Sequence, residues 1–144
     1  TMTDYMAYAM RMSPDRIILG ELRSNEVVPY LMALNTGHRG SISSIHSNSA
    51  TDALHRLTML YSVYSTTNID YDKVINLASQ GVDLVVYVKN KKVVSLTEIL
   101  GGQKGQVTSK EVEYSQNQKY FSLAKCMSMF SLPILKNIKN VIIF

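Results

Sequence analysis

Short apolar runs alternate with longer amphipathic stretches along the first 80 residues, and this alternation constrains the fold more than any other feature. The runs at residues 16–19 and 41–45 have the length and composition of strands. The first run is apolar throughout after Arg16, as expected of a strand that is buried on both faces. Strands that alternate with helices form a mainly parallel sheet with helices on its faces. The sequence therefore predicts an α/β fold.

The amphipathic stretches carry the end signals of helices. Thr1 and Asp4 form a capping-box pattern, and Ser49 and Asp52 form a second one. Pro14 ends the first stretch and Gly37 ends the second, since proline restricts the residue before it and glycine favours helix termination. The predicted helices span residues 1–13, 25–36, 49–64 and 71–81.

The remaining residues predict a hairpin followed by a separate tail. Residues 82–89 and 93–100 flank Asn90-Lys91-Lys92, a pattern typical of an antiparallel hairpin. Gly101, Gly102 and the polar stretch that follows predict a boundary between residues 1–101 and a tail of residues 102–144. In the tail we expect a strand at 107–114, a helix at 121–130 and a last short helix after Pro133.

Titratable residues follow the two predicted strands at their carboxyl ends. Gly20-Glu21 follows the first strand, and His46 follows the second. Chemistry in parallel sheets collects at the carboxyl ends of strands, so Glu21 and His46 are expected at one edge. In nucleotide hydrolases, an acidic residue at such a place holds Mg²⁺ or orients the attacking water. A histidine there could donate a hydrogen bond to a terminal phosphate. Alone, Glu21 is more simply read as a solvated strand-end carboxylate, and the alternative for His46 is a histidine that is capped by Ser47 or Asn48 or packed against a turn.

Two other chemistries fit less well. His38, His46 and Glu21 could be imagined as a two-histidine, one-carboxylate metal site. The histidines are eight residues apart along one strand, so they are expected at its opposite ends. Nucleophilic catalysis by serine also fits less well, because the sequence has no G-x-S-x-G turn.

Charge is distributed unevenly along the chain. The formal net charge is +4, with all five arginines in the first 56 residues and all ten lysines from Lys73 onward. Arginine suits phosphate and carboxylate recognition, and it appears where the motifs cluster. Direct DNA binding by the lysine-rich half is a weaker alternative, because few aromatic residues accompany those lysines. The chain has no apolar run near the ~18 residues of a membrane span, and the single Cys126 fits a reducing compartment.

Two motifs together resemble a known family. Residues 11–23, RMSPDRIILGELR, look like the Walker B region of the secretion-type traffic ATPases, and residues 34–49, LNTGHRGSISSIHSNS, look like their histidine box. The eight-residue step from His38 to His46 is more like the type IV secretion and conjugative branch. The resemblance covers residues 1–101, and Ser13 departs from it because the family usually has arginine there.

The resemblance implies a fold, a reaction and roles for individual residues. The fold would be the C-terminal part of a RecA-like P-loop NTPase core, and the reaction ATP hydrolysis. Glu21 would act on Mg²⁺ and the catalytic water, and His46 would sense the terminal phosphate. Arg23, His38 and Arg56 would support the nucleotide site or the subunit boundary. The intact protein would be a bacterial cytoplasmic hexamer docked on inner-membrane secretion or pilus components.

The phosphate-binding part of such a site is missing from these residues. No G-x-x-x-x-G-K-[ST] pattern occurs in the 144 residues, and the non-Met start agrees with a truncated chain. That loop supplies most phosphate contacts in this kind of fold, so we expect this chain alone to bind ATP weakly or not at all. The alternative is a non-catalytic assembly or partner-binding module derived from such an ATPase.

Overall fold

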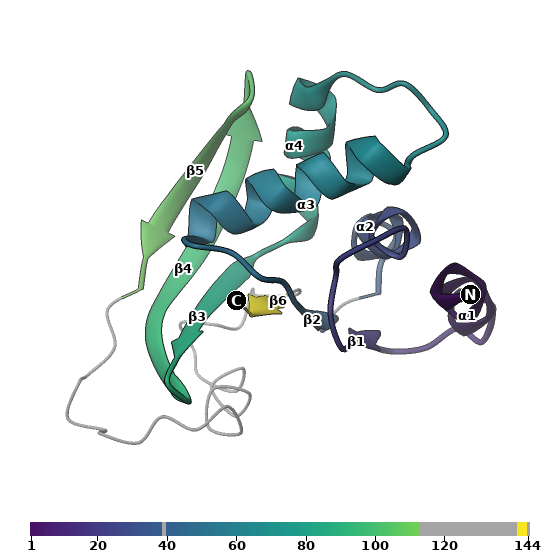
Figure 1. Ribbon diagram of the computed structural model, residues 1–144, viewed down its shortest axis with the longest axis horizontal. Helices are drawn as coiled ribbons and strands as arrows, with labels where there is room; N and C mark the ends of the chain where they lie inside the picture. The colour runs from purple at the N-terminus through teal and green to yellow at the C-terminus, as the bar shows by residue number, and fades with distance from the viewer. Residues whose placement is uncertain (39, 113–140, 144) are drawn as a thin grey trace.

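The computed structural model describes residues 1–38, 40–112 and 141–143, and these residues contribute to a single six-stranded sheet (Figure 1). The strands follow the order β1-β2-β6-β3-β4-β5 across the sheet. Helices α2, α3 and α4 lie on one side of it (Figure 1). This arrangement confirms the α/β prediction. The elements are α1 (Met2–Arg11), β1 (Ile18–Leu19), α2 (Val27–Asn35), β2 (Ile42–Ser44), α3 (Ala50–Tyr64), α4 (Tyr71–Gly81), β3 (Leu84–Lys89), β4 (Lys92–Gln103), β5 (Gln106–Glu111) and β6 (Val141–Ile143).

Four of the strands run parallel. β1 pairs with β2, β2 with β6, and β6 with β3, whereas β3, β4 and β5 pair antiparallel. In the first pair Ile18 lies opposite Ile42 and Leu19 lies opposite Ser43. The polypeptide therefore leaves β1 and β2 at the same edge of the sheet. This places the residues after Leu19 beside those after Ser44.

The predicted helix signals act as expected. Thr1 and Asp4 form a complete capping box at α1, and the Ser49 hydroxyl accepts a hydrogen bond from the Asp52 N–H at α3. Gly37, with φ of +101°, follows the end of α2. Pro29 lies in the first turn of α2, where its missing N–H removes no helical hydrogen bond. Among the described helices none is long and apolar enough to cross a bilayer.

Two groups of buried side chains hold the layers together. The larger group joins the helices to the sheet and includes the fully buried Tyr30, Leu54 and Ile75. The smaller group includes Leu84, Val86, Val93 and Leu96. Because alternate residues of a strand point to opposite faces, β3 is buried on both faces, with Val85 in the larger group and its neighbours in the smaller one.

The prediction that the first strand is buried on both faces is wrong. Ile17 and Leu19 are buried in the larger group, but Ile18 between them is 70% exposed. β1 has a strand neighbour only on its β2 side in the described sheet. Its alternate residues point away from the helices, and this explains why a continuous apolar run does not give a continuously buried strand here.

The structure also changes the interpretation of the C-terminal half. The hairpin is confirmed, and its turn is Asn90-Lys91, both with positive φ (51° and 60°), while Lys92 already belongs to β4. β4 continues through Gly101 and Gly102 to Gln103 and turns into β5, so the proposed boundary at residue 101 is not visible as a break in the sheet. The predicted strand after residue 106 is confirmed as β5.

The end of the chain is a strand that the sequence analysis missed. Val141–Ile143 forms β6 in the middle of the sheet, between β2 and β3. The Ile45 N–H donates to the Ile143 carbonyl at 2.8 Å, which extends the pairing beyond β2. A three-residue strand is too short to show a periodicity in sequence. The helix predicted at 121–130 and the start of the one predicted after Pro133 lie outside the described residues.

One buried hydroxyl provides a test of this core. The Tyr30 hydroxyl is fully buried and has no hydrogen-bond partner among the residues that the structure describes, and burial raises its pKa far above the ordinary value. An unsatisfied buried hydroxyl is destabilising, so Tyr30→Phe should raise the free energy of unfolding by about 1 kcal/mol, measured by urea unfolding. Tyr5→Phe, at a site 71% exposed, is the matched control and should have no effect. A loss of stability in Tyr30→Phe would mean that the hydroxyl has a partner in solution.

Candidate active site

Glu21 and His46 meet at the carboxyl edge of β1 and β2. The His46 Nε2 atom lies 3.1 Å from Glu21 Oε1, and Arg23 Nη1 lies 3.7 Å from Glu21 Oε2. The Glu21 side chain is one-third exposed, whereas His46 is 88% exposed. Three residues that the sequence analysis selected for chemistry are therefore brought together, although 25 positions separate Glu21 from His46.

Stability alone gives little reason for this cluster. Exposed ion pairs contribute about 0–1 kcal/mol, because water screens the charges and ordering the side chains costs entropy. His46 and Arg23 both present most of their surface to solvent. A carboxylate held between an imidazole and a guanidinium at an open strand end is instead suited to contacting a ligand.

The backbone around the pair is bonded across the two strands. The Leu22 N–H donates to the Ser44 carbonyl at 2.8 Å, and the Ser44 hydroxyl donates to the Gly20 carbonyl at 2.6 Å. Leu22 itself is buried. The residue on each side of Glu21 is thus tied to β2, which limits how far the Glu21 backbone can move away from His46.

A buried carboxylate shapes the turn after Glu21. Glu26 is only 4% exposed, and its Oε1 accepts from the backbone N–H groups of Arg23 at 2.7 Å and Ser24 at 2.9 Å. The Ser24 hydroxyl donates to Oε2. Burial by itself would raise the pKa of Glu26, but these hydrogen bonds together hold the pKa below its ordinary value.

A second carboxylate has the same relation to the turn after His46. Asp52 Oδ2 accepts from the Asn48 backbone N–H and from the Ser47 hydroxyl, each at 3.1 Å. The hydrogen bond from the Asn48 backbone is the main reason that the pKa of Asp52 is lowered. Only one of the two hydrogen bonds of the predicted capping box is therefore formed, the one from the Asp52 N–H to the Ser49 hydroxyl. The Asp52 carboxylate bonds to Asn48 and Ser47 rather than to the Ser49 N–H.

His38 lies apart from the pair. It precedes β2, whereas His46 follows it, and its Nδ1 atom lies 3.3 Å from the Ala33 carbonyl near the end of α2. In the described part of the chain no three His, Cys, Asp or Glu side chains are grouped to hold a metal ion. The metal site of two histidines and one carboxylate, which the sequence analysis ranked low, is thus not formed there.

Arg56 lines a cavity on the outer side of α3. The cavity has a volume of about 420 Å³, and Arg56 itself is exposed. One wall is a stacked pair, His55 and Tyr71, with ring centroids 6.2 Å apart and planes 7° from parallel. His55 is half-buried. The other lining residues are Asn48, Asp52 and Met59.

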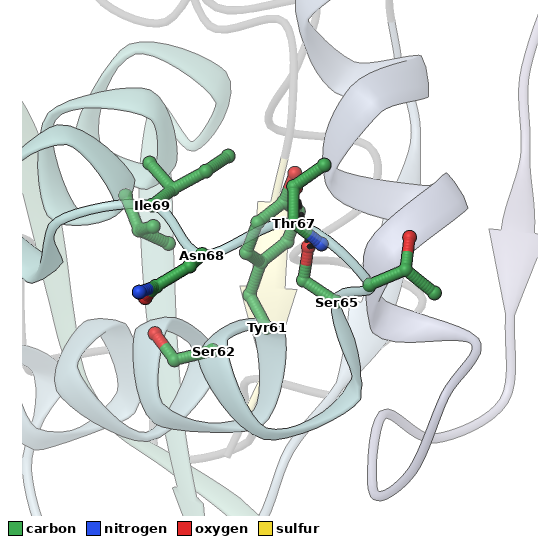
Figure 2. A pocket seen from close by; sticks show the side chains of 8 residues that line it. Tyr61, Ser62, Ser65, Thr67, Asn68 and Ile69 are labelled. Atoms are coloured by element: carbon green, nitrogen blue, oxygen red, sulfur yellow. Dashed lines mark hydrogen bonds between the residues drawn. The ribbon is translucent and has the colours of Figure 1, made fainter.

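A second hollow lies at the far end of α3 (Figure 2). It has a volume of about 260 Å³, and hydroxyl and amide side chains such as Ser62, Ser65 and Asn68 line it together with Ile69. None of its lining residues carries a formal charge. Neither of these two hollows includes Glu21 or His46.

The sequence analysis missed the residues that hold the pair. Glu26 and Ser44 lie within a predicted helix and a predicted strand, and the sequence analysis gave neither of them a role at the site. A carboxylate just before an apolar helix and after a short polar turn is a usable signal for Glu26. No local sequence pattern predicts the hydrogen bond from Ser44 to Gly20, because it depends on the register between β1 and β2.

The hydrogen bonds of Glu26 predict an acid-sensitive stability. Its pKa is lower in the folded than in the unfolded chain, so its contribution is present at neutral pH and is lost as pH falls below about 4.5. Glu26→Gln should lower the free energy of unfolding at pH 7 by about 1–3 kcal/mol, and this deficit should shrink toward pH 3 in urea titrations. Glu111→Gln, exposed on β5, is the control. A deficit that does not depend on pH would contradict the role assigned to the carboxylate charge.

Comparison with known proteins places the chain among secretion proteins. The chain is 40% identical over 80 residues to the probable conjugal transfer protein TrbB of Sinorhizobium fredii, a match covering 56% of this chain and 23% of TrbB. It is 37% identical over 90 residues to the type IV secretion system protein PtlH of Bordetella pertussis, a match covering 62% of this chain and 26% of PtlH. The chain thus spans about a quarter of the length of these relatives.

A solved structure and a family profile complete the comparison. The VirB11 ATPase of the Brucella suis type IV secretion system, solved with sulphate, superposes with a TM-score of 0.56 over 90% of this chain and 34% of its own. At 23% identity this likeness shows a shared fold. The profile of the family described as type II/IV secretion system protein matches residues 1–119, which include Glu21 and His46. The chain therefore belongs to the type II/IV secretion system protein family.

Proposed function

We propose that this chain is part of a RecA-like ATPase core that powers type IV secretion, conjugative transfer or pilus assembly. The observation that carries the proposal is the 3.1 Å contact between Glu21 and His46 at the carboxyl edge of parallel strands. Nucleotide hydrolases need an acidic group beside the terminal phosphate and a polar group that responds to that phosphate. The family supports the same reading, since similar proteins are named as a conjugal transfer protein and a type IV secretion system protein.

The donor groups of the pair fit a nucleotide bound with Mg²⁺. Glu21 offers two carboxylate oxygens at an open strand end, and among the described residues it belongs to no group of three His, Cys, Asp or Glu side chains that could hold a metal ion. It would therefore reach the ion through water rather than by direct ligation, and it would orient the attacking water. Bound Mg²⁺ supplies charge neutralisation of the phosphates. Arg23, next to Glu21, adds a positive charge on the same edge.

His46 is suited to report the terminal phosphate. Its Nε2 atom lies 3.1 Å from Glu21 Oε1, which is within ion-pair distance when the ring is protonated. A phosphate oxygen would compete with Glu21 for this nitrogen, and the exposed ring has room to turn toward either group. If His46 exchanged Glu21 for the terminal phosphate, binding of that phosphate would be coupled to the position of the turn after β2.

The remaining predicted residues take narrower roles in this proposal. Arg56, exposed beside a cavity on α3, would face the boundary with a neighbouring subunit. His38 would act at the other end of β2, through the end of α2. The intact protein would be a bacterial cytoplasmic hexamer at the inner-membrane face, and hydrolysis would drive rigid-body movements of its subunits.

A second candidate function follows from the missing phosphate loop. Since no G-x-x-x-x-G-K-[ST] pattern occurs in these 144 residues, the chain could serve as a non-catalytic assembly or partner-binding module. The gene upstream of Thr1 discriminates between the two. A phosphate-binding loop encoded there supports the motor, and a natural start codon near Thr1 supports the module.

Nucleotide binding by the chain itself is the first test. The contacts of Glu21 and His46 cannot replace those of a glycine-rich loop and its lysine, so ATP with Mg²⁺ should give no saturable rise in melting temperature. The measurement is a thermal-shift titration over ATP concentrations into the millimolar range, with Mg²⁺ alone as the control. Clear saturation would contradict this expectation and would mean that the described residues grip phosphate by themselves.

The catalytic roles are tested in the gene product that carries the phosphate-binding loop, if the gene encodes one. Glu21→Gln should slow ATP hydrolysis by about 10²-fold or more, because a positioned base contributes that much, while nucleotide binding persists. His46→Gln should reduce hydrolysis as well. Asp70→Asn, at an exposed position before α4, is the control and should retain full activity. Full hydrolysis in Glu21→Gln would overturn the proposed role of that carboxylate.

A further inference from the structure

Both residues of the candidate site lie on turns that join a strand to a helix. Glu21 lies between β1 and α2, and His46 lies between β2 and α3. Each turn receives a carboxylate from the start of the helix that follows it, Glu26 at α2 and Asp52 at α3. Negative charges are favoured at helix N-termini, so the helix dipole stabilises both the Glu26 and the Asp52 carboxylates.

The two carboxylates bond their turns at equivalent places. Glu26 accepts from the backbone N–H of Arg23, and Asp52 accepts from the backbone N–H of Asn48. In each case the donor is two residues after the residue of the site. In each case a serine hydroxyl of the same turn also contacts the carboxylate. The Ser24 hydroxyl donates to Glu26, and the Ser47 hydroxyl is shared between Asp52 at 3.1 Å and the Ser49 carbonyl at 2.9 Å.

The burial of Glu26 shows that its place is specific. Burying a charged carboxylate is costly unless hydrogen bonds compensate for the lost water. Glu26 is 4% exposed, and the hydrogen bonds known for its two oxygens all come from Arg23 and Ser24. Its carboxylate therefore acts on the turn that begins at Glu21.

The exposed side chain of His46 needs such support. At 88% exposure it has little packing to fix it, so its position depends on the backbone of its turn. Glu21 is one-third exposed, but both of its neighbours in the contact, Arg23 and His46, are themselves exposed. A shift of about 1 Å in a reacting group can cost 10²-fold in rate, so backbone placement matters for a site of this kind.

We propose that Glu26 and Asp52 are positioning residues of the site, which hold the two turns so that Glu21 and His46 meet. Neither touches the reacting groups. The inference rests on the proposed function only in the reason it gives for holding Glu21 and His46 together. Whether Glu26 and Asp52 hold them together can be tested without nucleotide. A failure of ATP hydrolysis in the longer protein would therefore leave the result of this test standing.

The test uses the 144-residue chain labelled with ¹³C and ¹⁵N at histidine. The ring resonances of His46 are recorded at one pH, and Glu21→Gln defines their position when the charged partner is removed. Glu26→Gln and Asp52→Asn keep the side-chain size but remove the charge that accepts the hydrogen bonds. Each should move the His46 resonances toward the Glu21→Gln position. The Glu26→Gln variant should leave the ring resonances of His38 in place, since that ring bonds to the end of α2.

Asp70→Asn is the matched control. Asp70 is also an acidic residue at a helix N-terminus, but it forms no cap hydrogen bond and pairs at the surface with Lys73 at 3.5 Å. It should leave the His46 resonances unchanged. If removing any helix-start carboxylate had the same effect, the shift would report net charge rather than positioning, and the proposal would fail.

The other outcomes are equally decisive. Folded Glu26→Gln and Asp52→Asn variants with wild-type His46 resonances would overturn the proposal, as would a Glu21→Gln variant that does not move them. If either variant does not fold, Ser24→Ala and Ser47→Ala remove one donor from each turn and keep the carboxylates. A His46 shift in these serine variants supports positioning, and unchanged resonances in both overturn it.

Discussion

The parallel pairing of β1 with β2 is the interaction on which the candidate site depends. It is short, with Ile18 opposite Ile42 and Leu19 opposite Ser43, and it is extended by the hydrogen bond from Leu22 to Ser44. Side chains alternate along strands, so a register slip of one residue would turn the following residues to the other face. The contact between Glu21 and His46 exists because this register brings two strand ends to the same level.

Most of the stability of the described fold lies elsewhere. Fully buried residues of α2, α3 and α4, such as Tyr30, Leu54 and Ile75, pack against the sheet at a distance from the exposed pair. Burial of such side chains contributes about 1.5–3 kcal/mol each, far more than an exposed ion pair. The pair can thus serve a ligand rather than the fold. The carboxylates of Glu26 and Asp52 connect the two, since they belong to helix starts but bond to the turns of the site.

The sequence predicted elements well wherever a local signal exists. Capping patterns at Thr1 and Ser49 mark two helix starts, and the positions of Glu21 and His46 after apolar runs place them at one edge. The sequence analysis failed where a residue's burial or strand pairing depends on segments that are distant in the sequence. The exposure of Ile18 depends on what covers β1, and the strand at Val141–Ile143 depends on the opening between β2 and β3.

The sequence by itself determined the α/β class, the helix boundaries to within a few residues, and the two titratable strand ends that define the candidate site. These follow from periodicity, capping and chain order, which act over a few residues. Only the tertiary structure decided that Glu26 is buried under the turn after Glu21, that Ser44 bonds to Gly20, and that the His38 ring lies against the Ala33 carbonyl. These contacts join segments through strand register and helix packing, which no local pattern encodes.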